Sequence, residues 1–268
     1  MIFEKDLNIH IGLEDYSLIL NDFQRDELDL ILPSGEFIYV GLYKPFNALY
    51  WEFVEASADD AIGRADYFNG TLWTPLENYQ DDTLSGSRSG FIKWKKPEDW
   101  TSSMVGTSDL FWIKFYFSVD FVAKIRAINI LFSDDNDLKK ELQSIEKYLA
   151  QGQISFAPTH QTVRDDIVQT LRNKGKIKYG PNQKFNQITK WDLLDISEVN
   201  LASKYFVLEK IFWQASGAPG DKFSVRQREA KSEGDKAFDL AFLSLDEDDT
   251  GKDPGKMNVR QMVYVERV

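Results

Sequence analysis

Apolar residues in the first half of the chain follow the short, alternating pattern of β-strands. Runs of aromatic and β-branched residues are separated by turn sequences such as Lys44-Pro-Phe-Asn47 and Asn69-Gly70. Several short strands divided by turns are typical of an antiparallel β-sandwich. The pattern predicts strands at residues 36–43, 48–55, 67–73, 90–95, 109–119 and 123–132.

The second half changes to the spacing of amphipathic helices. A first helix is expected after Thr159 and before Gly175, with a second over residues 196–215 and a third over 221–245. An acidic turn follows at 246–255, and a terminal strand is expected at 257–265. The predicted fold class is α+β, an N-terminal antiparallel β-sandwich followed by a C-terminal helical bundle with a terminal β-strand.

Charge divides the chain in the same way. Residues 1–158 hold 14 basic and 26 acidic side chains, whereas residues 159–268 hold 18 and 17. This asymmetry favours two modules with different surroundings. We therefore predict an acidic N-terminal arm at 1–35, a sandwich domain at 36–135, a helical linker at 136–158 and a helical domain with a C-terminal strand at 159–268.

Composition narrows the possible functions. The 268 residues carry a net charge of −11, which opposes general affinity for nucleic acid or an anionic membrane. The chain has no cysteine, and its only histidines are His10 and His160. His160 is interpreted as a capping or solvated residue at a helix start. Because no phosphate-binding loop, dinucleotide fingerprint or nucleophile motif is present, we expect neither an enzyme nor a cofactor.

One segment resembles the beginning of a calcium-binding loop. Oxygen ligands are available at Asp246, Asp248 and Thr250, with Gly251 at the turn position. The twelfth position is Met257, where such a loop needs a bidentate glutamate. An acidic solvated turn is therefore favoured over a calcium site.

Basic residues cluster around the end of the first predicted helix. A solvated helix end explains them, since cations are favoured near the C-terminal dipole. The alternatives to a solvated helix end are a contact with an acidic protein and a contact with passing DNA. Of these two, the protein contact is preferred. The cluster comprises Arg164, Arg172, Lys174, Lys176 and Lys178.

Tryptophans crowd the predicted sandwich, where core and rim packing is their ordinary role. The alternative is a carbohydrate-binding platform, because sugar faces stack on exposed aromatic rings. The residues proposed for this platform are Trp73, Trp94 and Trp100.

The terminal strand has an apolar face and no evident hairpin partner in the sequence. It could therefore pair with a neighbouring chain by strand addition. Its apolar positions are Met257, Val259, Met262, Val263 and Val265.

An ordered series of motifs runs through residues 36–135. It includes a tryptophan after an Asn-Gly turn, an Asp-Asp-Thr, a Ser-Gly-x-Ile-x-Trp strand and a Trp-Ile-Lys strand. The segments that carry the series are Glu36–Trp51, Phe68–Leu76, Asp81–Thr83, Ser89–Trp94, Pro97–Trp100 and Phe111–Phe115. The series resembles a β-sandwich module of tailed-phage virion proteins, in which an arginine is usual where this chain has Lys114.

The second half is similar, in layout more than in letters, to the helical head-to-tail connector proteins, or adaptors, that sit beneath the phage portal. The lead-in Trp191–Asp195, the long helix through Tyr205–Phe212, the following helix and the C-terminal strand occupy the corresponding places. The resemblance implies a structural virion protein of the neck, assembled in the host cytoplasm into a ring of subunits, a dodecamer in that family.

The same resemblance implies the partners. They are the portal protein, the tail and neck proteins, and viral DNA that passes through the channel without sequence-specific binding; no membrane is involved. A baseplate or tail protein whose tryptophan-rich sandwich binds host carbohydrate is the alternative function. The segment implied to contact the portal or the next subunit comprises Met257, Val259, Arg260, Met262, Val263, Val265 and Arg267.

Overall fold

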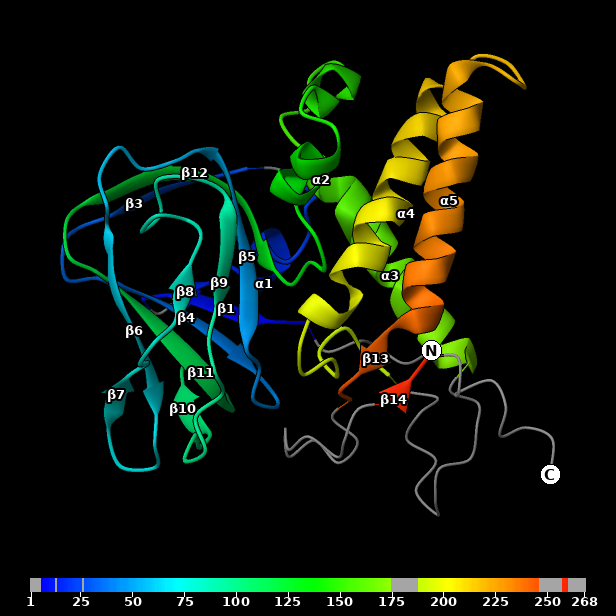
Figure 1. Ribbon diagram of the computed structural model, residues 1–268. Coiled ribbons are helices and arrows are strands. Elements are labelled where there is room, and N and C mark those ends of the chain that lie inside the picture. The colour runs from blue at the N-terminus through cyan, green and yellow to red at the C-terminus, as the bar shows by residue number, and fades with distance from the viewer. Residues whose placement is uncertain (1–5, 13, 26, 175–187, 246–256, 260–268) are drawn as a thin grey trace, which may run out of the picture. The chain divides into compact units, whose positions relative to one another are not determined.

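The computed structural model describes residues 6–12, 14–25, 27–174, 188–245 and 257–259 (Figure 1). The chain divides into two compact units, whose main boundary lies between Ile130 and Leu131. The first unit contains the strands β1–β12 and the second contains the long helices, which confirms the predicted α+β fold class. Among the described residues, no helix has the length and apolarity that a membrane span needs.

The first unit consists of two antiparallel sheets. The larger sheet has seven strands in the order β2-β1-β4-β11-β6-β7, with β10 also paired to β11. Alternating residues of its strands are buried, as in Phe37–Leu42, because only one face of such a sheet lies against the core. Its strands are β1 (Asn8–Ile11), β2 (Glu14–Asp15), β4 (Phe37–Leu42), β6 (Ile62–Phe68), β7 (Trp73–Pro75), β10 (Ser103–Val105) and β11 (Ser108–Phe117).

The smaller sheet has five strands in the order β3-β12-β5-β9-β8. Aromatic rings fill the space between the two sheets. Trp51 of the smaller sheet meets Phe115 of the larger one with ring centroids 5.1 Å apart, and Phe117 stacks on Phe121 at 4.5 Å. All four side chains are fully buried. The strands are β3 (Leu28–Leu32), β5 (Ala48–Glu55), β8 (Gln80–Asp81), β9 (Gly90–Lys93) and β12 (Phe121–Asn129).

The acidic N-terminal arm expected at residues 1–35 is not separate from the sandwich. In the structure β1 pairs with β4 and β3 pairs with β12, while the short helix α1 (Ser17–Leu20) lies against β12. Leu30 and Leu32 alternate with the exposed Asp29 and Ile31, so the acidic residues face solvent and the leucines complete the core. The compact sandwich unit therefore begins earlier than predicted, and it ends at Ile130 rather than at residue 135.

The second unit is built on three long helices (Figure 1). The helix α4 (Ser197–Ala215) differs by one residue from the predicted range, and α5 begins at Lys222, directly after Asp221. The expected linker at 136–158 contains α2 (Asp135–Glu141) and a 3₁₀ turn (Ile145–Tyr148) within this same unit. The remaining elements are α3 (Ala157–Lys174), α5 (Lys222–Leu240), β13 (Phe242–Leu243) and β14 (Met257–Asn258).

Candidate functional site

The hairpin formed by α4 and α5 is the candidate functional element of the helical unit. The two helices lie side by side and are joined by residues 216–221 (Figure 1). They approach closely at Gly234, where an added Cβ would lie 2.7 Å from the Phe206 ring. Helices that pack this closely form a rigid pair, which can present side chains at fixed positions on its outer surface.

Large apolar side chains remain exposed near both ends of this hairpin. Close to the connecting loop, Trp213 is 66% exposed and Val225 is also exposed. We call these two residues the tip surface. At the other end, Leu201, Leu240 and Phe242 are exposed, Leu240 at 68%; we call these the base surface. Exposed apolar side chains at the two ends of a rigid helix pair are candidate positions for contact with another chain.

Asp221 fixes the loop at the tip of the hairpin. Its carboxylate accepts hydrogen bonds from the backbone N–H groups of Ser224 and Gly217, and also from those of Ala218 and Phe223. These donors lower the pKa of Asp221 to about 2, because they stabilise the ionised carboxylate. The loop and the first turn of α5 are thus held by one side chain, as expected for an N-cap.

The predicted basic patch is largely used inside the unit. Arg164 is buried and pairs with the aspartate that follows it. Arg172 donates a hydrogen bond to the carbonyl oxygen of Ile188, and Lys174 Nζ lies 3.1 Å from a carboxylate oxygen of Asp239. These three cations therefore interact within the unit, whereas the sequence favoured a solvated helix end, with a contact patch for an acidic protein as the alternative. Lys176 and Lys178 lie outside the described residues.

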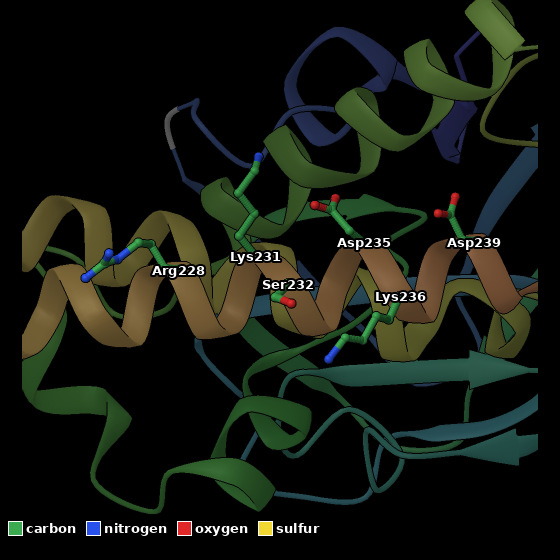
Figure 2. Close-up of a pocket in the computed structure, with 6 residues that line it drawn as sticks. All are labelled: Arg228, Lys231, Ser232, Asp235, Lys236 and Asp239. Atoms are coloured by element: carbon green, nitrogen blue, oxygen red, sulfur yellow. The ribbon is translucent and has the colours of Figure 1, made fainter.

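A shallow, open depression lies along α5. Figure 2 shows Lys231, Asp235 and Asp239 extending to one side of the helix and Lys236 to the other. Lys236 pairs with Glu233 and Asp239 with Lys174, so part of this charge is already neutralised. All of the lining residues belong to one helix, and they include charges of both signs. Such a surface is typical of a solvated helix face rather than of a catalytic pocket.

The C-terminal strand has a partner within its own chain. β14 pairs antiparallel with β13, with Leu243 opposite Met257. Val259 is fully buried, and its N–H donates to the carbonyl oxygen of Ala241. The expectation that this strand lacks a hairpin partner is therefore wrong for residues 257–258, and Val259 is not available to a neighbour. The other residues of the implied portal contact, Arg260, Met262, Val263, Val265 and Arg267, lie outside the described residues.

Trp94 and Trp100 have the core role that was favoured for the tryptophans, and the alternative carbohydrate platform is not formed. Trp94 and Trp100 are buried against Phe46, with ring centroids 5.4 Å and 5.3 Å from it. Only Trp73 is partly exposed, and it lies on another part of the sandwich, beside Tyr39. The sequence pattern could not separate these tryptophans, because core and surface aromatic residues occur in the same short strands.

His160 is buried, which corrects its interpretation as a capping or solvated residue. Its Nδ1 lies 2.8 Å from Ser133 Oγ, which in turn lies 2.8 Å from Ser203 Oγ. Its Nε2 is 3.3 Å from an Asp135 carboxylate oxygen. The group resembles a serine–histidine–aspartate arrangement, but Ser133, His160 and Ser203 are all fully buried, so a dissolved substrate does not reach the serine. The network joins the start of α2 to α3 and α4.

The carboxylates beside this network have opposite pKa shifts. Burial raises the pKa of Asp134, and the neighbouring Asp137 charge adds to the effect. Burial also acts to raise the pKa of Asp137, but hydrogen bonds from Lys140 and Asn200 outweigh it and lower the pKa. Asp134 also caps α2 through a capping box. These shifts follow from the packing of a helix start.

The candidate calcium-binding residues Asp246, Asp248 and Thr250 lie outside the described residues. Within the part of the chain that the structure describes, no group of three or more histidine, aspartate or glutamate side chains is placed to hold a metal ion.

Sequence reasoning missed the exposed apolar residues of the hairpin. Trp213 directly follows Phe212, which is buried. Adjacent residues on a helix point about 100° apart, so the helical period alone could have placed Trp213 outside the buried stripe. The exposure of Leu240 and Phe242 could not be predicted in this way, because the predicted third helix continued through both residues to residue 245.

Comparisons with known proteins add little. No protein-family model matches the chain, and no curated protein sequence matches it. A solved chain described as "CpGH89CBM32-6 produced by Clostridium perfringens" aligns with 48% of this chain and 94% of its own length, at 11% identity and a TM-score of 0.28. A likeness this weak supports no conclusion about fold or function.

Proposed function

We propose that this protein is a structural component of a tailed-phage virion, a head-to-tail connector of the neck that assembles into a ring between portal and tail. The observation that carries the proposal is the α4–α5 hairpin with exposed apolar side chains at both of its ends. The sandwich is then a peripheral module. The resemblance of the sequence to adaptors suggested this function, and a unit built on long helices supports it.

The arrangement of the exposed side chains favours a ring over a symmetric dimer. A ring uses heterologous contacts, in which one surface of a subunit meets a different surface of the next. The tip surface, with Trp213 and Val225, and the base surface, with Leu201, Leu240 and Phe242, are two different apolar surfaces. Tryptophan is among the residues that contribute most to interfaces. We propose that the tip surface of one subunit contacts the base surface of its neighbour.

The ring can be tested with the purified full chain. Light scattering coupled to size-exclusion chromatography should give a mass several times the 31.0 kDa of one chain, and negative-stain electron microscopy should show rings. Trp213→Glu and Leu240→Glu should each shift the protein to the monomer, because each places a charge in one half of the contact. Thermal unfolding of the variants shows whether they remain folded.

Ile31→Glu is the matched control. Ile31 is 73% exposed on the sandwich, and the substitution introduces the same charge on a residue of similar exposure. It should leave the mass unchanged. Two results would rule out the proposed contact. The chain could stay monomeric at high concentration and also in the presence of its portal protein, or all three variants could disrupt assembly equally.

The location can be tested in particles. Gold labelling of a tagged copy should mark the head–tail junction of intact phage. Label at the tail tip would instead favour the baseplate alternative, and a particle without the protein would contradict the virion function itself.

A further inference from the structure

The outer face of the larger sheet carries a group of side chains that the assembly function does not use. Phe115 packs against Trp51 of the opposite sheet, so its neighbours in β11, Lys114 and Tyr116, point away from the core. Tyr39 of β4 and Asp66 of β6 lie directly opposite Lys114 on the two adjoining strands. These residues therefore form one row across the outer face.

Aromatic rings form a continuous group on this face. Phe37 contacts Tyr39 and Tyr116, with centroids 6.2 Å and 5.6 Å apart, and Tyr39 contacts Trp73 at 5.7 Å. Trp73 also meets Phe68 at 5.8 Å. All five rings are partly exposed, whereas the rings between the two sheets are fully buried. Partly exposed rings held by their neighbours provide apolar surface that is already in place for a ligand.

The Lys114 ammonium lies among these rings. Its Nζ is 3.5 Å from the centroid of Phe37, and 5.8 Å and 5.6 Å from those of Tyr39 and Trp73. Burial lowers the pKa of Lys114, because the charged form loses contact with water. The Asp66 charge acts to raise the pKa of Lys114, and burial outweighs it. The N–H groups of the ammonium can donate to an acceptor.

A second pair of charges borders the group. The Arg64 guanidinium lies 5.4 Å from the Tyr116 ring and 3.1 Å from Asp66 Oδ2. The Asp66 side chain is 1% exposed, and its Oδ1 is buried with no hydrogen-bond partner among the described residues. Charges of both signs border the rings, because Lys114 and Arg64 face the Asp66 carboxylate and the Glu36 carboxylate acts on Tyr39.

We propose that this outer face binds a carbohydrate that carries carboxylate groups, with its sugar rings stacked on Trp73 and Tyr39. The ligand carboxylate pairs with Lys114 and Arg64, which border these rings. Sugars fit because they combine an apolar ring face with hydroxyl donors and acceptors. Dense phosphate is disfavoured, since residues 1–158 carry 26 acidic against 14 basic side chains. The inference is independent of ring assembly.

Binding can be measured by isothermal titration calorimetry on the full chain. The probes are tetrasaccharides of galacturonate, glucuronate and mannuronate, with maltotetraose as the neutral comparison and an oligothymidylate as the nucleic acid comparison. At least one uronate should bind saturably, about tenfold or more tightly than maltotetraose, and more weakly as salt is raised. No binding by any uronate, or equal or tighter binding of maltotetraose or the oligothymidylate, overturns the proposal.

Lysine variants locate the site. Lys114→Met should reduce the affinity about tenfold or more, and Lys114→Arg should retain most of it, because the guanidinium also carries the charge and stacks on rings. Lys93→Met is the matched control, since Lys93 Nζ lies 4.5 Å from the Phe91 ring on the smaller sheet. Equal loss in Lys93→Met and Lys114→Met would place binding elsewhere. Trp73→Ala tests the stacking independently and should weaken binding without lowering the unfolding temperature as far as a core substitution.

Discussion

Gly234 shows how a single residue determines the packing of the hairpin. A glycine inside a helix usually lowers its stability by about 1 kcal/mol relative to alanine. Here the position is buried, and the space that a Cβ would occupy is filled by the Phe206 ring. The glycine therefore permits close contact between α4 and α5, and this contact outweighs its poor helix propensity.

Gly234→Ala should consequently destabilise the helical unit, by about 1–3 kcal/mol, because overpacking forces the helices or the ring to move. Chemical denaturation followed by circular dichroism measures the change. Ser232→Ala is the control, since Ser232 is exposed on the same helix and its substitution should be neutral or slightly stabilising. If both variants gain stability, the close contact at Gly234 does not govern the packing.

The tryptophans show that residue type alone does not predict whether a side chain is buried. Trp94 and Trp100 are buried, whereas Trp213 is mostly exposed. Residue type alone gives no means of distinguishing them, because tryptophan is equally suited to cores and to interfaces. Their different environments depend on which other elements cover each position.

At the scale of elements, helix starts and turns could be predicted from the residues that cap helices and form turns. The strand predicted at 67–73 is in fact a hairpin between β6 and β7, in which Asn69 Oδ1 accepts from the N–H groups of Thr71 and Leu72, and Gly70 adopts a φ of 92°. The Asn-Gly sequence was itself the signal for this turn. The third helix, in contrast, ends at Leu240, because the next residues pair with β14.

The cap of α5 gives a pH dependence. The pKa of Asp221 is lowered from 3.8 to about 2 in the folded chain. A lowered pKa stabilises the folded state fully above the unfolded value, and this contribution is lost as the pH falls through about 2. The unfolding temperature of the wild type relative to Asp221→Asn should therefore decrease between pH 5 and pH 2.

Asn is the informative substitution because it also caps helices but does not titrate over this range. Asp221→Ala should lose the cap as well, and so unfold at a lower temperature than Asp221→Asn at neutral pH. Thermal melts followed by circular dichroism measure both differences. A wild-type advantage over Asp221→Asn that is constant with pH would contradict the role of the charge.

At the scale of the whole molecule, the two compact units divide the chain differently from the sequence-based boundaries. The strands β1 and β3 belong to the sandwich, although the acidic composition of residues 1–35 favoured a separate arm. Without them, β4 and β12 would each lose a neighbouring strand, and core residues next to them would be exposed.

Two fragments test this division. A fragment of residues 1–130 should fold cooperatively and remain monomeric, because both sheets are complete within it. A fragment of residues 36–135, the sequence-predicted module, should aggregate or unfold at a clearly lower temperature. Calorimetry and size-exclusion chromatography provide the measurements. Equal stability of the two fragments would show that β1 and β3 are dispensable.

The residues of the candidate sites could be predicted only in part from the sequence. The aromatic richness of the sandwich suggested carbohydrate binding, but the predicted residues were two buried tryptophans together with Trp73. Lys114 was singled out only as a departure from a family pattern. Its position among the rings depends on the pairing of β4, β11 and β6, strands that are far apart in the sequence.

The type of most elements, the order of sandwich and helices, and the start of α5 directly after Asp221 could be read from the sequence alone. Each of these depends on interactions between residues close along the chain, which periodicity and capping record. Contacts between distant segments were needed to show that β1 and β3 complete the sheets, that β13 pairs with β14, that His160 is buried and which aromatic rings face outward. A pattern tells which side of an element is apolar, but it does not identify what covers that side.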